Sequence, residues 1–118
     1  MTQSEEVITV CGTISPDEMG ITQTHEHLQV DALDHYGTYN LVIDDEEQVI
    51  NELIEFTAAG GKTICDVTLD EIGRNPLALK RISEASGVQV LMGSGWYRQF
   101  GYPTIVNEKT SCQLAEHL

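Results

Sequence analysis

The segment that decides the fold is residues 44–68, which read DDEEQVINELIEFTAAGGKTICDVT. Asp44 has the character of a helix N-cap, with Glu47 at the capping-box position three residues later. The apolar side chains that follow recur at helical spacing and predict one stripe facing a core: Val49, Ile50, Leu53, Ile54 and Phe56. Gly60 and Gly61 then end the helix. The segment therefore predicts an amphipathic helix that runs directly into a strand.

The same alternation of helix and strand continues on both sides of this segment. Gly20–His27 is a strand candidate before the helix, and Lys62–Thr68 is the strand after it. Asn75 and the proline after it predict the start of a second helix over Leu77–Ser86. Val88–Met92 supplies the next strand. Strand, helix, strand, helix, strand is typical of a parallel sheet with right-handed crossovers, so the fold class is α/β.

The two ends of the chain suggest one domain that is incomplete. Val7–Ile14 alternates like a short strand or hairpin arm and is followed by turn-forming residues. Asn107–Leu118 predicts the start of a third helix and contains no terminating glycine or proline. We expect a single α/β domain over residues 1–118, with a hairpin region over 1–19 and the first sheet units over 20–118.

Composition narrows the class of partner. The 118 residues are 41% hydrophobic, which suits one globular core, and the formal net charge of -13 disfavours nucleic acid and anionic membranes. No apolar run is long enough to span a bilayer, and Met1–Glu6 lacks the features of a signal peptide. Three widely spaced cysteines predict reduced thiols. These features predict a cytoplasmic protein.

The tripeptide His25-Glu26-His27 is the sharpest chemical signal in the chain. Side chains repeat every two residues along a strand, so both imidazoles would point to one face. Two such imidazoles can converge on one zinc ion at about 2.0 to 2.1 Å. The alternative is a pair of solvated histidines at a surface strand end. Because a catalytic zinc normally takes three protein ligands, further ligands would have to come from elsewhere.

Other candidate residues lie near the predicted strand ends. Asp66 either supports this site or is a buried carboxylate bonded to backbone. Trp96 and Tyr97 either form the apolar wall of a substrate pocket or pack within their loop. Arg74 either reaches an anionic group or pairs with neighbouring acids. Solvent-exposed positions are expected for the remaining histidines, His35 and His117.

Several motifs in order resemble those of the phosphotriesterase-related proteins of the amidohydrolase superfamily. The segments that carry the resemblance are Val10–Ile14, Gly20–Leu28, Gly61–Thr68, Ile72–Asn75 and Val88–Tyr97. The resemblance implies a (β/α)8 TIM-type barrel in which His25 and His27 bind the more buried ion of a two-metal site, with zinc the expected metal. It also implies that Tyr97 lines the substrate pocket and that a hydroxide activated by the metals attacks an ester, lactone or phosphotriester.

The chain is too short to form the whole barrel that the resemblance implies. A (β/α)8 barrel needs about 250 residues, and the sequence predicts about three strand and helix units. The bridging carboxylated lysine or glutamate and the other later ligands of the family are absent, so the chain alone is expected to be inactive. We therefore expect the N-terminal portion of a metal-dependent hydrolase that acts on a small ester, lactone or organophosphate.

The alternative is a non-catalytic binding or assembly module with a vestigial metal site. The exposed edge of an incomplete parallel sheet invites pairing with another chain. Homo-oligomers are therefore among the expected assemblies.

Overall fold

The centre of the fold is a three-stranded parallel sheet within residues 5–118, the part of the chain that the computed structural model describes. Its strands lie in the order β3 (Ile21–Glu26), β6 (Gly61–Asp66) and β7 (Gln89–Met92). Both pairings are parallel, so all three carboxyl ends meet at one edge of the sheet. The predicted α/β class with a parallel sheet is confirmed.

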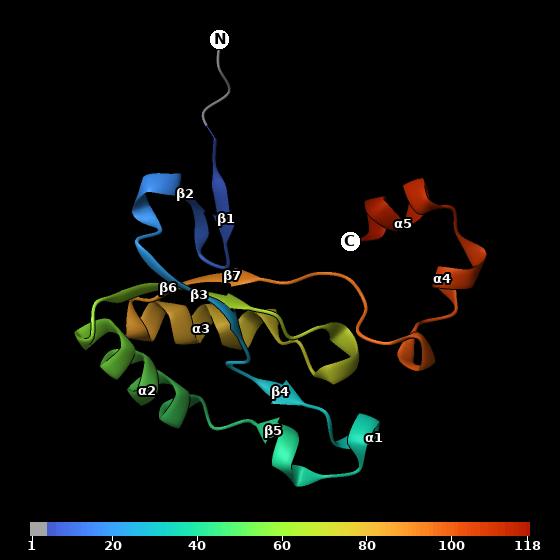
Figure 1. Ribbon diagram of the computed structural model, residues 1–118, viewed down its shortest axis with the longest axis horizontal. Helices are drawn as coiled ribbons and strands as arrows, with labels where there is room; N and C mark the ends of the chain where they lie inside the picture. Colours follow the sequence, from blue (N-terminus) through green and yellow to red (C-terminus); the bar gives the residue numbers. More distant parts are fainter. Residues whose placement is uncertain (1–4) are drawn as a thin grey trace.

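Two helices connect these strands and lie next to each other against one face of the sheet (Figure 1). They are α2 (Glu46–Ala58) and α3 (Pro76–Ser86). The buried core lies between helices and sheet and consists of Leu28, Val49, Leu53, Ile64, Leu79, Ile82, Val88 and Val90. Ile54 does not join it, because its side chain is 49% exposed. The predicted stripe on α2 is therefore narrower than its sequence spacing suggested.

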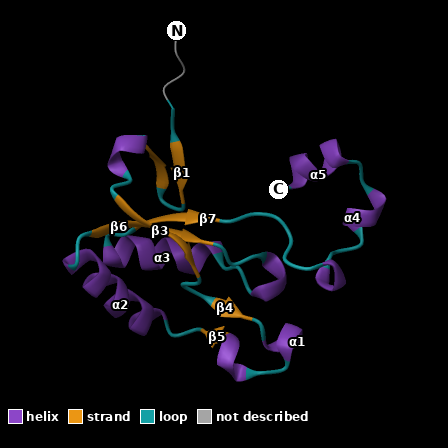
Figure 2. Ribbon diagram, in the orientation of Figure 1, coloured by secondary structure: helices purple, strands orange, loops and turns teal. Residues whose placement is uncertain are grey.

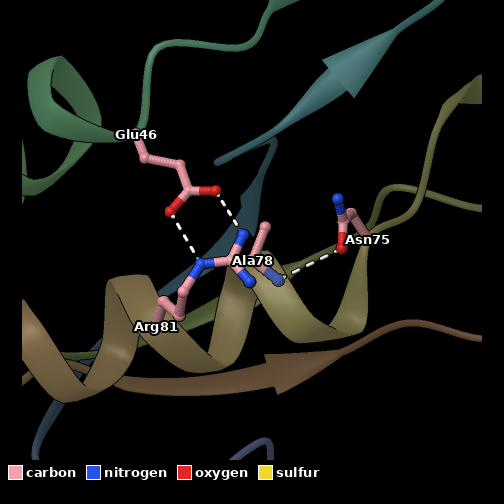
Figure 3. Close-up of polar contacts among 4 residues, drawn as sticks. All are labelled: Glu46, Asn75, Ala78 and Arg81. Carbon is pink, nitrogen blue, oxygen red and sulfur yellow. Dashed lines mark hydrogen bonds and ion pairs between the residues drawn. The ribbon is translucent and has the colours of Figure 1, made fainter.

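The helix starts follow local capping chemistry. The N-cap of α2 is Asp45, one residue later than the predicted Asp44, and its Oδ1 accepts the N–H of Gln48 at 3.0 Å. Asn75 caps α3 as predicted, with its Oδ1 accepting the N–H of Ala78 at 3.1 Å (Figure 3). Asp44 and Asp45 are equally suitable N-cap residues by type, and the backbone conformation decides which of them caps the helix.

An ion pair joins the start of α2 to α3. The guanidinium of Arg81 donates to both carboxylate oxygens of Glu46, at 3.1 and 2.5 Å (Figure 3). These hydrogen bonds hold the pKa of Glu46 below its ordinary value and raise the pKa of Arg81.

Replacing Arg81 with glutamine should raise the pKa of Glu46 toward its ordinary value. The stabilisation from the pair is present above the pKa of Glu46 in the unfolded chain, and it is lost as pH falls through the lowered folded value. An NMR titration of the Glu46 carboxyl carbon measures this shift. Lys80→Gln on the same helix is the control and should leave the Glu46 titration unchanged, because Lys80 lies beside Glu84.

A hairpin precedes the sheet, as the sequence predicted. Its strands β1 (Val7–Thr9) and β2 (Gly12–Ile14) pair in antiparallel fashion. The hairpin contacts β7 through Val10, whose N–H donates to the carbonyl oxygen of Val90 at 2.9 Å. Residues 1–4 lie outside the described part of the chain, so the boundary of the hairpin region at residues 1–19 stays a prediction.

The segment after β3 is folded rather than an open loop. Strands β4 (Val30–Asp31) and β5 (Val42–Ile43) form a small antiparallel ribbon, and the connection between them contains the one-turn helix α1 (Leu33–Tyr36) (Figure 2). His35 belongs to α1, and its side chain lies outside the description, so its expected exposure stays a prediction. Short two-residue strands carry too little periodicity to be recognised in a sequence.

The predicted third helix over the last residues is divided into two. They are α4 (Ile105–Glu108) and α5 (Ser111–His117), and extended backbone at Lys109 separates them. Thr110 caps α5, because its hydroxyl oxygen accepts the N–H of Gln113. None of the helices in residues 5–118 combines the length and hydrophobicity that a bilayer span requires.

Candidate functional site

The two histidines of the tripeptide lie together at the carboxyl edge of the sheet. His25 is near the end of β3, and His27 follows its last residue. Their ring centroids are 5.7 Å apart and the ring planes are nearly perpendicular. The structure thus brings the two predicted ligands close together, next to the loops that leave β6 and β7.

A cavity of about 290 Å³ lies beside this pair. Its polar groups are the imidazoles of His25 and His27 and the phenols of Tyr36 and Tyr97, and its aliphatic walls come from Val30, Ala32, Leu41, Val67 and Ile72. Small-molecule sites are typically apolar cavities with a few convergent polar groups. This cavity is therefore the candidate substrate site.

Thr68 fixes the orientation of His27. The Thr68 Oγ1 lies 2.9 Å from Nδ1 of His27, a hydrogen bond whose direction follows the imidazole tautomer. With Nδ1 engaged in this way, Nε2 is the nitrogen left for a metal ion. Metal-binding histidines commonly have their second ring nitrogen held by a hydrogen bond of this kind. Sequence reasoning missed Thr68, although it lies at the end of the segment that reads as the next strand.

Replacing Thr68 with valine removes this hydrogen bond at nearly constant side-chain volume. The affinity of the metal site should fall by about 10-fold or more, because outer-shell partners of metal-binding histidines typically contribute 10- to 100-fold. Zinc titration against a chromophoric chelator measures the change. Thr57→Val on α2 is the control, because the Thr57 hydroxyl donates to the carbonyl of Leu53 away from the site. Equal affinities for Thr68→Val and the unmodified protein would contradict the role given to Thr68.

Asp66 holds the backbone next to His27 and at Thr68. Its side chain is fully buried, and Oδ2 accepts the N–H of Leu28 at 2.7 Å while Oδ1 accepts the N–H of Thr68 at 3.0 Å. Of the two alternatives raised by the sequence, the structure confirms the buried carboxylate bonded to backbone, and a role of Asp66 in a metal site stays a prediction. The carboxylate is bonded to backbone, and the two amides that it holds belong to the residue after His27 and to the residue that orients His27.

Gly93 allows the end of β7 to approach this point closely. The Gly93 N–H donates to the carbonyl of Asp66 at 2.7 Å. A Cβ at Gly93 would lie 3.2 Å from that carbonyl oxygen and 3.3 Å from Cα of Val67. Arg74 donates to the carbonyl of Gly93 at 2.8 Å and pairs with Asp70 at 2.8 Å. The pairing of Arg74 with a neighbouring acid is therefore confirmed.

The two aromatic candidates have different surroundings. Tyr97 lines the cavity, and Tyr36 donates its hydroxyl hydrogen to the Tyr97 oxygen at 3.0 Å. Trp96 is not among the lining residues; it stacks on His117 with ring centroids 6.5 Å apart and also contacts Tyr102. His117 is thus a packing partner as well as an exposed residue. Sequence reasoning missed Tyr36, which no local pattern marks.

The hydrogen bond between the two phenols shifts their pKa values in opposite directions. Donation to Tyr97 raises the pKa of Tyr36. Acceptance from Tyr36 lowers the pKa of Tyr97, and the positive charge of Arg98 lowers it further. Tyr97 is therefore the more acidic hydroxyl at the cavity.

The donor set fits two ligands of a divalent metal ion. Imidazole nitrogens suit zinc and similar ions, and Thr68 holds one ring as a metal ligand requires. Among the side chains that the structure describes, which do not include that of His35, no group of three or more histidine, cysteine or acidic side chains is arranged to hold a metal. A complete site would need ligands beyond those that this part of the chain supplies.

Residues 5–118 match the model of the phosphotriesterase family. This chain belongs to the phosphotriesterase family. It is 33% identical to a phosphotriesterase-related protein from Nematostella vectensis over 93% of its own length and 41% of that protein. It is 30% identical to an N-acetyltaurine hydrolase from Xenopus tropicalis, covering 98% of this chain and 42% of the relative.

Solved structures of the family show the same fold. The lactonase Lmo2620 from Listeria monocytogenes superposes with a TM-score of 0.73 at 28% identity, over 87% of this chain and 33% of the lactonase. The chain of 118 residues thus spans about two fifths of the length of these curated relatives. Its sheet and helices correspond to part of a TIM-type barrel, as the sequence predicted.

Proposed function

We propose that this chain is the N-terminal part of a metal-dependent hydrolase that cleaves a small ester, lactone or phosphotriester in the cytoplasm. His25 and His27 would hold one of two divalent ions, with zinc the first choice, and Tyr97 would contact the substrate. The observation that carries the proposal is the pair of adjacent imidazoles, one oriented by Thr68, at a cavity with apolar walls.

In this proposal the residues at and next to the cavity have distinct roles. When bound, the metal ions would polarise the substrate and lower the pKa of water. Thr68 holds the His27 ring in one orientation, and Asp66 fixes the backbone on both sides of that contact. The aliphatic walls receive the apolar part of the substrate and exclude water. The Tyr97 hydroxyl, which lines the cavity, would donate a hydrogen bond to a substrate oxygen.

Carboxylic acyl compounds are the first substrates to test. The relatives include proteins named lactonases and proteins named N-acetyltaurine hydrolases, and both names describe cleavage at a carbonyl carbon. The panel therefore contains δ-valerolactone, phenyl acetate and an N-acetylated amine, and diethyl 4-nitrophenyl phosphate is added to test the phosphotriester class. The protein should be isolated at the full length made in its source cell, because the chain alone is expected to be inactive.

The test of the proposed function is the metal dependence of hydrolysis. We expect turnover of at least one member of the panel, loss of that turnover after chelation, and recovery when zinc is restored. Turnover that survives complete chelation would refute metal dependence. Hydrolysis of none of the four substrate classes would refute the hydrolase itself.

A second candidate is the assembly module. A groove of about 600 Å³ runs between β3, β5 and α2, with an apolar floor that includes Leu28, Leu53 and Phe56. Because β3 is an edge strand of the sheet, a second chain that supplies the further barrel strands is the occupant that this groove fits. Light scattering separates the candidates: a 13.0 kDa monomer that unfolds cooperatively counts against the need for a partner.

A further inference from the structure

We propose that Tyr36 and Glu71 are positioning residues that hold Tyr97 in one orientation at the cavity and thereby set which substrates bind there. The inference rests on the proposed function for the nature of the cavity, although the contacts themselves are properties of this chain. Tyr36 comes from the folded segment after β3, Glu71 from the turn after β6, and Tyr97 from the loop after β7.

Glu71 holds the backbone of Tyr97. Its Oε1 accepts the N–H of Tyr97 at 2.5 Å. Hydrogen bonds to a charged acceptor are about twice as strong as neutral ones. The second oxygen, Oε2, is buried and has no hydrogen-bond partner among the described residues. Glu71 is half-buried, and the hydrogen bond from the Tyr97 amide is the contact through which its carboxylate acts on the loop after β7.

Tyr36 holds the side chain of the same residue. Its hydroxyl donates to the Tyr97 oxygen at 3.0 Å, and the two rings meet edge to face with centroids 6.5 Å apart. The guanidinium carbon of Arg98 lies 5.5 Å from the centroid of Tyr36 and 5.1 Å from that of Tyr97. Cation–π contacts of this kind favour the paired arrangement of the rings.

Anchored at its amide and at its phenol, Tyr97 has little freedom to reorient when a substrate enters. An oriented hydroxyl beside the aliphatic walls of the cavity selects compounds that present an oxygen acceptor next to an apolar group. Preorganised contacts of this kind contribute affinity because the side-chain entropy is lost before the substrate binds. Small acyl compounds, such as lactones and esters, meet this description.

NMR spectroscopy of the chain labelled with 15N and with 13C at tyrosine Cζ tests the two anchors without substrate. Glu71→Gln should move the amide proton of Tyr97 upfield by weakening the hydrogen bond to a charged acceptor. Tyr36→Phe should move the Tyr97 Cζ signal by removing the donor to its oxygen. The controls are Glu55→Gln on α2 and Tyr39→Phe, since Tyr39 is 79% exposed. Unchanged Tyr97 signals in both variants would overturn the proposal.

Kinetics of the full-length protein with δ-valerolactone provide the second measurement. Tyr36→Phe should raise KM by about 2- to 10-fold, as expected for one neutral hydrogen bond, with kcat unchanged. A fall in kcat at constant KM would overturn the positioning of a substrate-binding group. If the unmodified protein hydrolyses nothing, the proposed function fails, while the Tyr97 signals still decide whether Tyr36 and Glu71 position Tyr97.

Discussion

Replacing Asp66 with alanine is expected to lower the free energy of unfolding by about 2 to 6 kcal/mol, because each of two buried N–H groups left without an acceptor costs about 1 to 3 kcal/mol. The fully buried carboxylate accepts the N–H groups of Leu28 and Thr68, which come from the loops after two different strands. Alanine leaves both donors without a partner and opens a small void. Native domains have a stability of only about 5 to 15 kcal/mol, so this loss is a large part of the total.

Urea unfolding followed by circular dichroism measures the effect of Asp66→Ala. Glu84→Ala on α3 is the matched control, since it removes a carboxylate whose side chain is 59% exposed. The control should change stability by less than about 0.5 kcal/mol, as surface substitutions usually do. A change below 1 kcal/mol for Asp66→Ala would mean that the two amides find other acceptors.

Asp66→Ala should also weaken metal binding, although Asp66 is not a ligand. Its loss frees the backbone on both sides of the contact between His27 and Thr68. Stability and metal affinity should therefore fall together in this variant. Thr68→Val, by contrast, should lower affinity with a smaller loss of stability.

The second large effect is expected at the proposed metal ligands, His25 and His27. Alanine at either His25 or His27 should lower zinc affinity by more than about 100-fold, because loss of a ligand exceeds the 10- to 100-fold effect of an outer-shell partner. Competition with a chromophoric chelator measures affinity in the full-length protein. His117→Ala is the control, because that ring stacks on Trp96 and is not among the residues that line the cavity. Equal affinities for all four proteins would place the metal elsewhere.

Most of the architecture could be predicted because its signals are local. The capping of α3 by Asn75 depends on residues within one helical turn, and the burial of Val49 and Leu53 follows from helical spacing. Alternation of such segments is sufficient to predict a parallel sheet. The errors are also local: two neighbouring aspartates compete for one cap, and Ile54 lies just outside the buried stripe.

The contacts that build the site could not be predicted in the same way. Thr68 lies 41 residues from His27, and Tyr36 lies 61 residues from Tyr97. Such pairs form only when the carboxyl ends of several strands meet, so neither partner has a marker in its own neighbourhood. The histidine pair was visible because its spacing matches the two-residue repeat of a strand. Its orienting hydroxyl and the carboxylate below it depend on the fold.

Our central claim is that His25 and His27 form part of the metal site of a hydrolase. The most direct test is the rate at which the zinc-supplemented, full-length protein hydrolyses its best substrate when both histidines are replaced by alanine. We expect the rate of the double variant to fall to the uncatalysed background, while His117→Ala retains the rate of the unmodified protein. A double variant that hydrolyses the substrate as fast as the unmodified protein would contradict the claim.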